Sequence, residues 1–309
     1  MTPPRLAAAG VDIGTNSVLL TVARPGPGGR LHILDERSVI TRLGAGLGQQ
    51  GALDPVAMER TLTVLEEFGS AVVALDATGR AVGTSALRRA HNADAFLDRA
   101  ADALGFPVEI VSGVDEARLG YRGALSDLPG VDIDDEPVVV DPGGGSTEVI
   151  ADRGRRAVSL EVGAVRLTEA FLPLPENDPP RPAALTELVA HVRRVVAPLE
   201  PAHGRPIVGV GGTATTLAAV ELGLDHYDPA RVHGTALELE TMRALVARLS
   251  ALTIAEREAI PCLPPGRADV AVAGGLLLVE LISQLGSDRL TVSDRGLRYA
   301  LIAEIIDAA

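Results

Sequence analysis

Residues 138–149 read Val-Val-Val-Asp-Pro-Gly-Gly-Gly-Ser-Thr-Glu-Val, an apolar stretch that ends in a carboxylate, turns on three glycines and becomes apolar again. A shorter form of the same pattern stands at residues 10–18, Gly-Val-Asp-Ile-Gly-Thr-Asn-Ser-Val. In each copy a glycine follows the aspartate, Asp12 or Asp141, by two residues and a hydroxyl residue comes soon after. Such a strand–turn–strand unit can surround an anion with backbone N–H groups, so the repeat predicts two phosphate-binding turns.

Each copy opens a run in which strand and helix patterns alternate. The first is followed by a predicted strand at 31–40 and by a helix at 93–104 that ends at Gly105, because glycine favours the left-handed conformation of a helix end. The second is followed by a predicted strand at 158–167 and a late apolar helix at 268–285. This repetition predicts an α/β protein of two related lobes with a cleft between them.

The stretch 126–137 separates the two runs. It is acidic and rich in turn residues, which is typical of a linker. We therefore expect an N-terminal lobe over 1–127 and a C-terminal lobe over 128–309, whose terminal helix is free to pack back on the first lobe. A hinge in the linker would let the lobes close on a substrate.

The composition excludes several classes of protein. All 28 basic residues are arginine, so neither a Walker A nucleotidase nor Schiff-base chemistry on lysine is available. The net charge of −13 argues against extended nucleic-acid binding. Cys262 is the single cysteine, and no apolar stretch has the length of a membrane span. We expect a cytoplasmic protein that neither enters a membrane nor binds nucleic acid.

Several motifs that occur in order carry a family resemblance. They are Val-Asp-Ile-Gly-Thr-Asn-Ser, Thr-Ser-Ala-Leu-Arg, Val-Ser-Gly-Val-Asp-Glu-Ala-Arg-Leu, Val-Asp-Pro-Gly-Gly-Gly-Ser-Thr-Glu, Val-Gly-Val-Gly-Gly-Thr and the late Ser-Asp-Arg-Gly-Leu-Arg. Together they resemble the exopolyphosphatase/guanosine pentaphosphate phosphohydrolase family, in the superfamily of actin, sugar kinases and heat-shock proteins. The length resembles that of the short, two-lobed members.

The resemblance implies two actin-like (ribonuclease H-like) lobes and hydrolysis of the terminal phosphoanhydride bond of inorganic polyphosphate, which releases orthophosphate. Guanosine pentaphosphate is the alternative substrate, and a homodimer is implied as well. Two other readings stay open: an ATP-dependent kinase of the same superfamily, and a ligand-sensing protein without activity.

Three carboxylates are candidates for the chemistry. The resemblance places Glu116 at the family's catalytic glutamate, although acidic residues also occur at helix starts for electrostatic reasons alone. Asp141 ends a buried strand and is predicted to bind Mg²⁺ or another divalent cation; its alternative role is to form the turn. Glu148 is predicted to share that metal or to act as the base, and its alternative is an exposed strand residue.

A larger set is predicted to bind the phosphate groups through glycine N–H groups, hydroxyls and two arginines. It comprises Asn16, Ser17, Arg88, Gly143, Gly144, Gly145, Ser146, Gly211, Gly212, Thr213 and Arg267. Two alternatives remain: Asn16 and Ser17 can simply cap their turn, and Arg267 can form a surface ion pair. Arg298 also resembles a family position near the cleft, and a surface ion pair is its alternative role as well.

Overall fold

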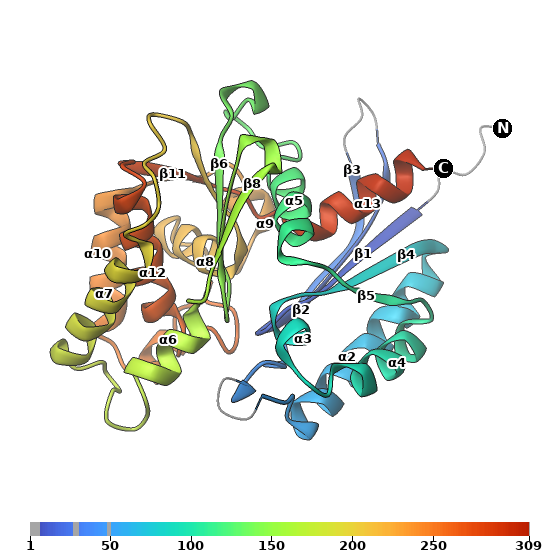
Figure 1. Ribbon diagram of the computed structural model, residues 1–309, viewed down its shortest axis with the longest axis horizontal. Helices are drawn as coiled ribbons and strands as arrows, with labels where there is room; N and C mark the ends of the chain where they lie inside the picture. Colours follow the sequence, from blue (N-terminus) through green and yellow to red (C-terminus); the bar gives the residue numbers. More distant parts are fainter. Residues whose placement is uncertain (1–6, 27–30, 48–50, 309) are drawn as a thin grey trace. The chain divides into compact units, whose positions relative to one another are not determined.

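The computed structural model describes residues 7–26, 31–47 and 51–308 and divides into two compact units (Figure 1). The first unit joins Met1–Asp127 to Gly296–Ala309, and the second is Leu128–Arg295. The predicted division kept 296–309 in the second lobe with its terminal helix free to pack back on the first, and this last helical stretch belongs to the first unit. None of the helices in the described ranges combines the length and the apolar character that crossing a membrane requires.

The first unit is built on a sheet with the strand order β3-β2-β1-β4-β5. Its strands are β1 (Ala7–Ile13), β2 (Ser17–Pro25), β3 (Leu31–Ile40), β4 (Ala77–Gly83) and β5 (Val108–Ile110). Its helices are α2 (Pro55–Ala74), α3 (Ser85–Arg89), α4 (Ala93–Leu104), α5 (Gly113–Ala124) and α13 (Leu297–Asp307). Strands β1 to β3 form an antiparallel meander, and β4 and β5 continue the sheet parallel to β1.

The two faces of β1 are covered by different helices. Val11 and Ile13 belong to the core that also holds Leu65 of α2 and Phe96 of α4. Because side chains alternate along a strand, Gly10 faces the other way, where α13 lies against the sheet. A Cβ atom at Gly10 would collide with the backbone carbonyl of Arg298, so glycine is required for this close approach.

Helix α13 is tied to the meander by a buried polar cluster. Arg298 Nε donates to Thr21 Oγ1 at 2.6 Å, and Arg298 Nη2 lies 2.8 Å from Glu36 Oε1. Tyr299 Oη also donates to Glu36, at 2.9 Å. Burial raises the pKa of the Glu36 carboxyl, but the Arg298 charge and these hydrogen bonds outweigh it and hold that pKa below its ordinary value. Arg298 is therefore a buried anchor of α13 within the first unit, not a surface ion pair.

The second unit repeats this architecture with the strand order β10-β11-β9-β6-β7-β8. Its strands are β6 (Val138–Pro142), β7 (Thr147–Ala151), β8 (Arg156–Leu160), β9 (Ile207–Gly209), β10 (Ala236–Glu238) and β11 (Arg289–Val292). Its helices are α6 (Ala164–Phe171), α7 (Pro182–Val196), α8 (Gly211–Glu221), α9 (Pro229–Val232), α10 (Leu239–Ser250), α11 (Ile254–Glu258) and α12 (Ala271–Gln284). Val138, Val140 and Val149 share one core with buried residues of α7, α8, α10 and α12.

The repeat predicted from the two aspartate–glycine patterns extends to the register of the strands. In each unit an antiparallel meander, β3-β2-β1 or β8-β7-β6, is followed by a strand parallel to its first member. Each meander carries one row of directly paired residues near its turn: Asp12–Leu19–Ser38 in the first unit and Asp141–Glu148–Ser159 in the second. The two rows differ mainly at their middle position, where leucine replaces glutamate.

One predicted element is wrong. The strand expected over 158–167 ends at Leu160, and the following residues form α6, which starts after Gly163. The run Val-Ser-Leu-Glu-Val-Gly-Ala-Val-Arg-Leu has too many apolar residues for its period to separate a strand from a helix. By contrast, the helix expected over 93–104 is confirmed, and Gly105 ends it with a φ of 80°.

Candidate functional site

The hairpin of β6 and β7 places two carboxylates directly opposite each other. Asp141 and Glu148 are paired residues of the antiparallel ladder, so their side chains project from the same face of the sheet. Glu148 is 5% exposed and accepts a 2.9 Å hydrogen bond from Ser159 Oγ on β8. Glu148 is thus a buried member of a polar row, which rules out the alternative of an exposed strand residue.

The glycine turn between these strands presents two N–H groups, and the carbonyls of Gly143 and Gly144 are occupied. Gly143 O accepts from Ala164 N at 2.9 Å, and Gly144 O accepts from Val165 N at 2.9 Å. Both donors belong to the first turn of α6, where helix N–H groups have no partner within the helix. In the described part of the chain, the N–H groups of Gly144 and Gly145 donate to no carbonyl, so they remain available for an anion.

A second turn, between β9 and α8, lies beside the first. Gly211 has a φ of +76°, which only glycine adopts without strain. A Cβ atom there would stand 2.5 Å from Asp141 Oδ1, so the Asp141 carboxylate lies against the start of α8. Gly212 packs in the same way on the guanidinium of Arg267, which a Cβ atom would overlap. The structure therefore brings together the predicted residues Asp141, Gly211, Gly212 and Arg267.

Arg267 lies half-buried in the segment before α12. Burial lowers the pKa of this guanidinium from its ordinary value, and the charges of Tyr227, Asp269 and Asp141 oppose the change. An arginine keeps its proton under such conditions, so Arg267 supplies one fixed positive charge near the two turns. The side-chain hydroxyl of Thr213 donates to Pro142 O at 3.3 Å, which leaves mainly the backbone N–H of this residue for a ligand.

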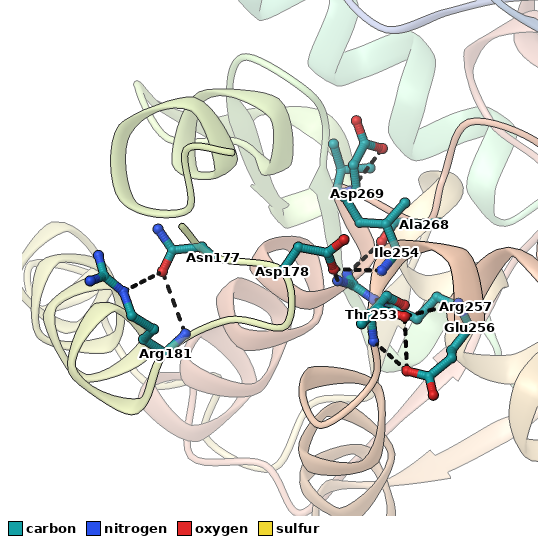
Figure 2. Close-up of polar contacts among 10 residues, drawn as sticks. Asn177, Asp178, Arg181, Thr253, Ile254, Glu256, Arg257, Ala268 and Asp269 are labelled. Carbon is teal, nitrogen blue, oxygen red and sulfur yellow. Dashed lines mark hydrogen bonds and ion pairs between the residues drawn. The ribbon is translucent and has the colours of Figure 1, made fainter. Parts of the chain in front are cut away.

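The segment that carries Arg267 is held by a second arginine, Arg257, for which the sequence predicted no role. Arg257 of α11 is 1% exposed, and its guanidinium donates to the carbonyl of Ala268, the residue after Arg267. Figure 2 shows Arg257 between Ala268 and Asp178, which lies in the loop that joins α6 to α7, and Arg257 Nη2 lies 3.8 Å from Asp178 Oδ1. The same Asp178 oxygen accepts from Ile254 N at 2.6 Å. One buried cation thus joins three segments around Arg267.

In the first unit, the structure pairs two other predicted residues. Arg88 of α3 forms an ion pair with Glu116 of α5, and it also donates to Val111 O at 3.1 Å. Burial raises the pKa of the Glu116 carboxyl above its ordinary value, and the charge and hydrogen bond of Arg88 only partly offset this effect. Arg89, the next residue, is exposed. A carboxyl with a raised pKa suits a general base that works near neutral pH.

Ser112 and Asp115, which precede Glu116, form the cap and the first turn of α5. Ser112 caps α5 by accepting from Asp115 N at 3.1 Å, and its hydroxyl donates to the Asp115 carboxylate at 2.6 Å. The Asp115 side chain is 57% exposed. Asp115 therefore stabilises the first turn of α5, whereas Glu116 points into a buried environment.

Asn16 and Ser17 lie in the β1–β2 turn, whose geometry matches that of the second copy. Gly14 N donates to Ser17 O at 3.0 Å, as Gly143 N donates to Ser146 O at 3.0 Å. The backbone carbonyl of Asn16 accepts from Thr41 N and Arg42 N after β3, at 3.0 and 2.9 Å. Its side-chain Nδ2, however, is buried and has no hydrogen-bond partner among the described residues. Asn16 therefore keeps one side-chain donor that the described residues do not use.

Comparison with known proteins shows which family this chain resembles. The model of the Ppx/GppA phosphatase family matches residues 21–309. Exopolyphosphatase 2 of Mycobacterium tuberculosis is 36% identical over 311 residues, which cover 94% of this chain and 95% of that protein.

Two solved structures are similar over nearly the whole chain. The crystal structure of the Ppx/GppA family member of Aquifex aeolicus has a TM-score of 0.82 at 34% identity, covering 99% of both chains. That of an exopolyphosphatase from Cytophaga hutchinsonii has a TM-score of 0.84 at 27% identity, covering 98% of both chains. These likenesses confirm the predicted α/β fold with two actin-like lobes, and the chain belongs to the Ppx/GppA phosphatase family.

Proposed function

We propose that the protein hydrolyses the terminal phosphoanhydride bond of inorganic polyphosphate and releases orthophosphate. The observation that carries this proposal is the gathering of two N–H-presenting turns, Arg267 and the Asp141–Glu148 pair at one edge of a sheet. The 36% identical relative is named an exopolyphosphatase, which supports the same substrate class. Guanosine pentaphosphate ends in the same kind of bond and is the alternative substrate.

The second unit would hold the phosphoryl group that is transferred. Backbone N–H groups of Gly144, Gly145 and Gly212 and the charge of Arg267 would bind its oxygens. These donors are fixed by the fold before the substrate arrives, so little reorganisation is needed as charge develops on the phosphoryl oxygens. Ser146, which is 5% exposed, closes the same turn.

The Asp141–Glu148 pair fits a divalent cation. Among the described residues, no group of three or more His, Cys, Asp and Glu side chains could hold a metal. Mg²⁺ does not need one, because it is usually bound by one or two carboxylates together with substrate phosphates and water. Asp141 and Glu148 supply such a pair of oxygen donors. When bound, Mg²⁺ would neutralise part of the charge on the phosphoryl oxygens.

Glu116 would take the proton from the attacking water. Its raised pKa places proton transfer closer to neutral pH, and Arg88 fixes the orientation of its carboxylate. Glu148 is the alternative base, since it is also a buried carboxylate with one hydroxyl donor. With Glu116 as the base, Arg88 would both position the Glu116 carboxylate and attract the phosphate chain.

The test is orthophosphate release from long-chain polyphosphate, short-chain polyphosphate and guanosine pentaphosphate, with and without Mg²⁺. Wild type, Glu116→Gln and Glu148→Gln are compared, and the length of the remaining polymer is followed on gels. Cleavage from the end leaves long polymer beside free orthophosphate, and the variant that loses turnover while still binding substrate identifies the base. Absence of release from all three substrates by the folded protein would overturn the proposal and favour phosphate transfer from ATP or ligand sensing.

A further inference from the structure

The row of paired residues Asp141–Glu148–Ser159 contains one member that the proposed reaction does not use. Ser159 of β8 is exposed, and its Oγ donates to Glu148 Oε1 at 2.9 Å. Glu148 is 5% exposed and lies on β7, between Asp141 of β6 and Ser159 of β8. A surface serine thus reaches a buried carboxylate that would hold the cation or act as the base.

The carboxylates of Asp141 and Glu148 lie toward opposite neighbours in the sheet. The strand order β9-β6-β7-β8 puts β9 beside β6 and β8 beside β7. Glu148 Oε1 is held from β8 by the hydroxyl of Ser159. Asp141 Oδ1 lies against Gly211, the second residue after β9, because a Cβ atom there would stand 2.5 Å from this oxygen. The two side chains therefore lean away from each other, although their strands are adjacent.

This arrangement separates two like charges. Directly opposite residues of an antiparallel pair have Cβ atoms about 4.5–5.5 Å apart, and like charges at that spacing repel. A hydroxyl that donates to one carboxylate draws that group aside and fixes its orientation. Mg²⁺ demands near-ideal octahedral geometry, so it gains from oxygen donors whose orientation is fixed before it binds.

The first unit contains the same row without the second carboxylate. It reads Asp12–Leu19–Ser38, and Ser38 is exposed as Ser159 is. The leucine in the middle offers no oxygen that could accept a hydrogen bond. A serine at this ladder position therefore has a carboxylate to hold only in the second unit.

We propose that Ser159 is a positioning residue for the cation: it holds the Glu148 carboxylate on the β8 side and so keeps the separation from Asp141 that a divalent cation needs. This inference rests on the proposed function, in which the two carboxylates bind Mg²⁺. Ser159 acts through Glu148 and not on the substrate. Removing a group that orients a metal ligand typically costs about 10- to 100-fold in metal affinity.

The probe is Mn²⁺, which takes the oxygen ligands and octahedral geometry of Mg²⁺ and is followed by electron paramagnetic resonance without substrate. Ser159→Ala removes the hydroxyl, and we expect it to raise the Mn²⁺ dissociation constant about tenfold. Ser159→Thr keeps the hydroxyl and should bind Mn²⁺ within about threefold of wild type. Thermal unfolding without metal should be the same for both variants and wild type, because Ser159 is exposed.

A second pair of variants guards against a disturbed edge strand. Ser159→Val and Ser159→Thr have the same shape and are both suited to a strand, so they differ by the hydroxyl alone. If Ser159→Ala does not fold, we expect the valine variant to bind Mn²⁺ about tenfold more weakly than the threonine variant.

Ser38→Ala is the matched control. It removes an exposed serine from the same ladder position of the first unit, where the paired residue is Leu19. It should leave the Mn²⁺ dissociation constant unchanged. A loss of Mn²⁺ affinity in Ser38→Ala equal to that in Ser159→Ala would overturn the inference, because the effect would then not depend on Glu148.

Equal Mn²⁺ affinity of the Ser159 variants with and without the hydroxyl would also overturn it, as would absence of Mn²⁺ binding by wild type. These outcomes are separable from that of the proposed function, since metal binding is measured without turnover. Hydroxyl-dependent Mn²⁺ binding in a protein that releases no orthophosphate would leave this inference standing and remove the proposed function. Orthophosphate release with hydroxyl-independent Mn²⁺ binding would do the reverse.

Discussion

Asp141 lies directly opposite Glu148 across the β6–β7 ladder, whereas the same ladder position in the β1–β2 hairpin pairs Asp12 with Leu19. The two hairpins share their turn geometry and their register, so the backbone alone does not distinguish them. The second carboxylate does. Two carboxylates on adjacent strands repel each other unless a cation or a proton lies between them, and this makes the second hairpin the favoured place for a metal.

Removing one carboxylate of this pair should weaken the response to Mg²⁺. We expect Glu148→Gln to raise the Mg²⁺ concentration that gives half-maximal activity by on the order of tenfold. The measurement is a titration of activity with Mg²⁺ at saturating substrate. Glu109→Gln, which changes an exposed glutamate of β5, is the control and should leave the titration curve unchanged. A normal Mg²⁺ requirement in Glu148→Gln would remove this residue from the metal site.

The pH dependence of the reaction should report the Glu116–Arg88 pair. Burial raises the pKa of Glu116, so the acidic limb of the plot of kcat/KM against pH should lie above the range of an ordinary glutamate. Arg88 is the group that lowers this pKa, so Arg88→Met should move the limb to higher pH while it also reduces the rate. Arg89→Met, at the exposed neighbour, should leave the limb in place. A shift toward lower pH in Arg88→Met would show that another group controls the limb.

Substitutions at two glycines with a positive φ, Gly211 and Gly223, should distinguish the effect of backbone strain from loss of function. Gly211 (φ +76°) lies against Asp141, whereas a Cβ atom at Gly223 (φ +58°) would meet nothing within 4 Å. We expect either Gly→Ala substitution to cost about 1–2 kcal/mol of unfolding free energy, because a left-handed conformation disfavours a side chain. Only Gly211→Ala should also abolish turnover, since it displaces the Asp141 carboxylate. Thermal unfolding and orthophosphate release measure the two effects, and an active Gly211→Ala variant would contradict the assignment.

Arg257 should matter for both stability and the affinity for phosphate. Arg257→Met leaves the carbonyl of Ala268 without its buried donor, and we expect a loss of about 2 kcal/mol in denaturant unfolding. Because Ala268 follows Arg267, phosphate binding should weaken as well. Arg243→Met breaks an exposed pair with Glu240 and should change stability by less than about 1 kcal/mol. Unchanged phosphate affinity in a folded Arg257→Met variant would show that the Arg267 segment holds its position without this contact.

The sequence predicted the turns and helix caps that depend only on residues close together in the chain. The two turns and the helix cap at Gly105 can be read from a few consecutive residues, because strand ends and caps have short signatures. The apolar run after Arg156 has no such signature, and the start of α6 after Gly163 becomes clear only once the N–H groups of this helix are seen to bond the glycine turn.

Contacts between distant residues could not be predicted. Arg88 and Glu116 are separated by 28 residues, and no spacing rule joins an arginine of one short helix to a glutamate of another. Arg257 and Asp178 are equally remote in sequence, and Arg257 looks like any other residue of a charged surface helix until its burial is known. Tertiary packing alone decides which polar groups are enclosed together.

The contact of α6 with the glycine turn decides which charge the turn attracts. A peptide turn normally offers both signs of partial charge, since every residue carries a donor and an acceptor. Here the first turn of α6 uses the carbonyls of Gly143 and Gly144, while the N–H groups of Gly144 and Gly145 stay available to an anion. In a protein with a net charge of −13 and no lysine, this turn can thus attract phosphate through backbone polarity, beside the carboxylate pair that would hold the cation.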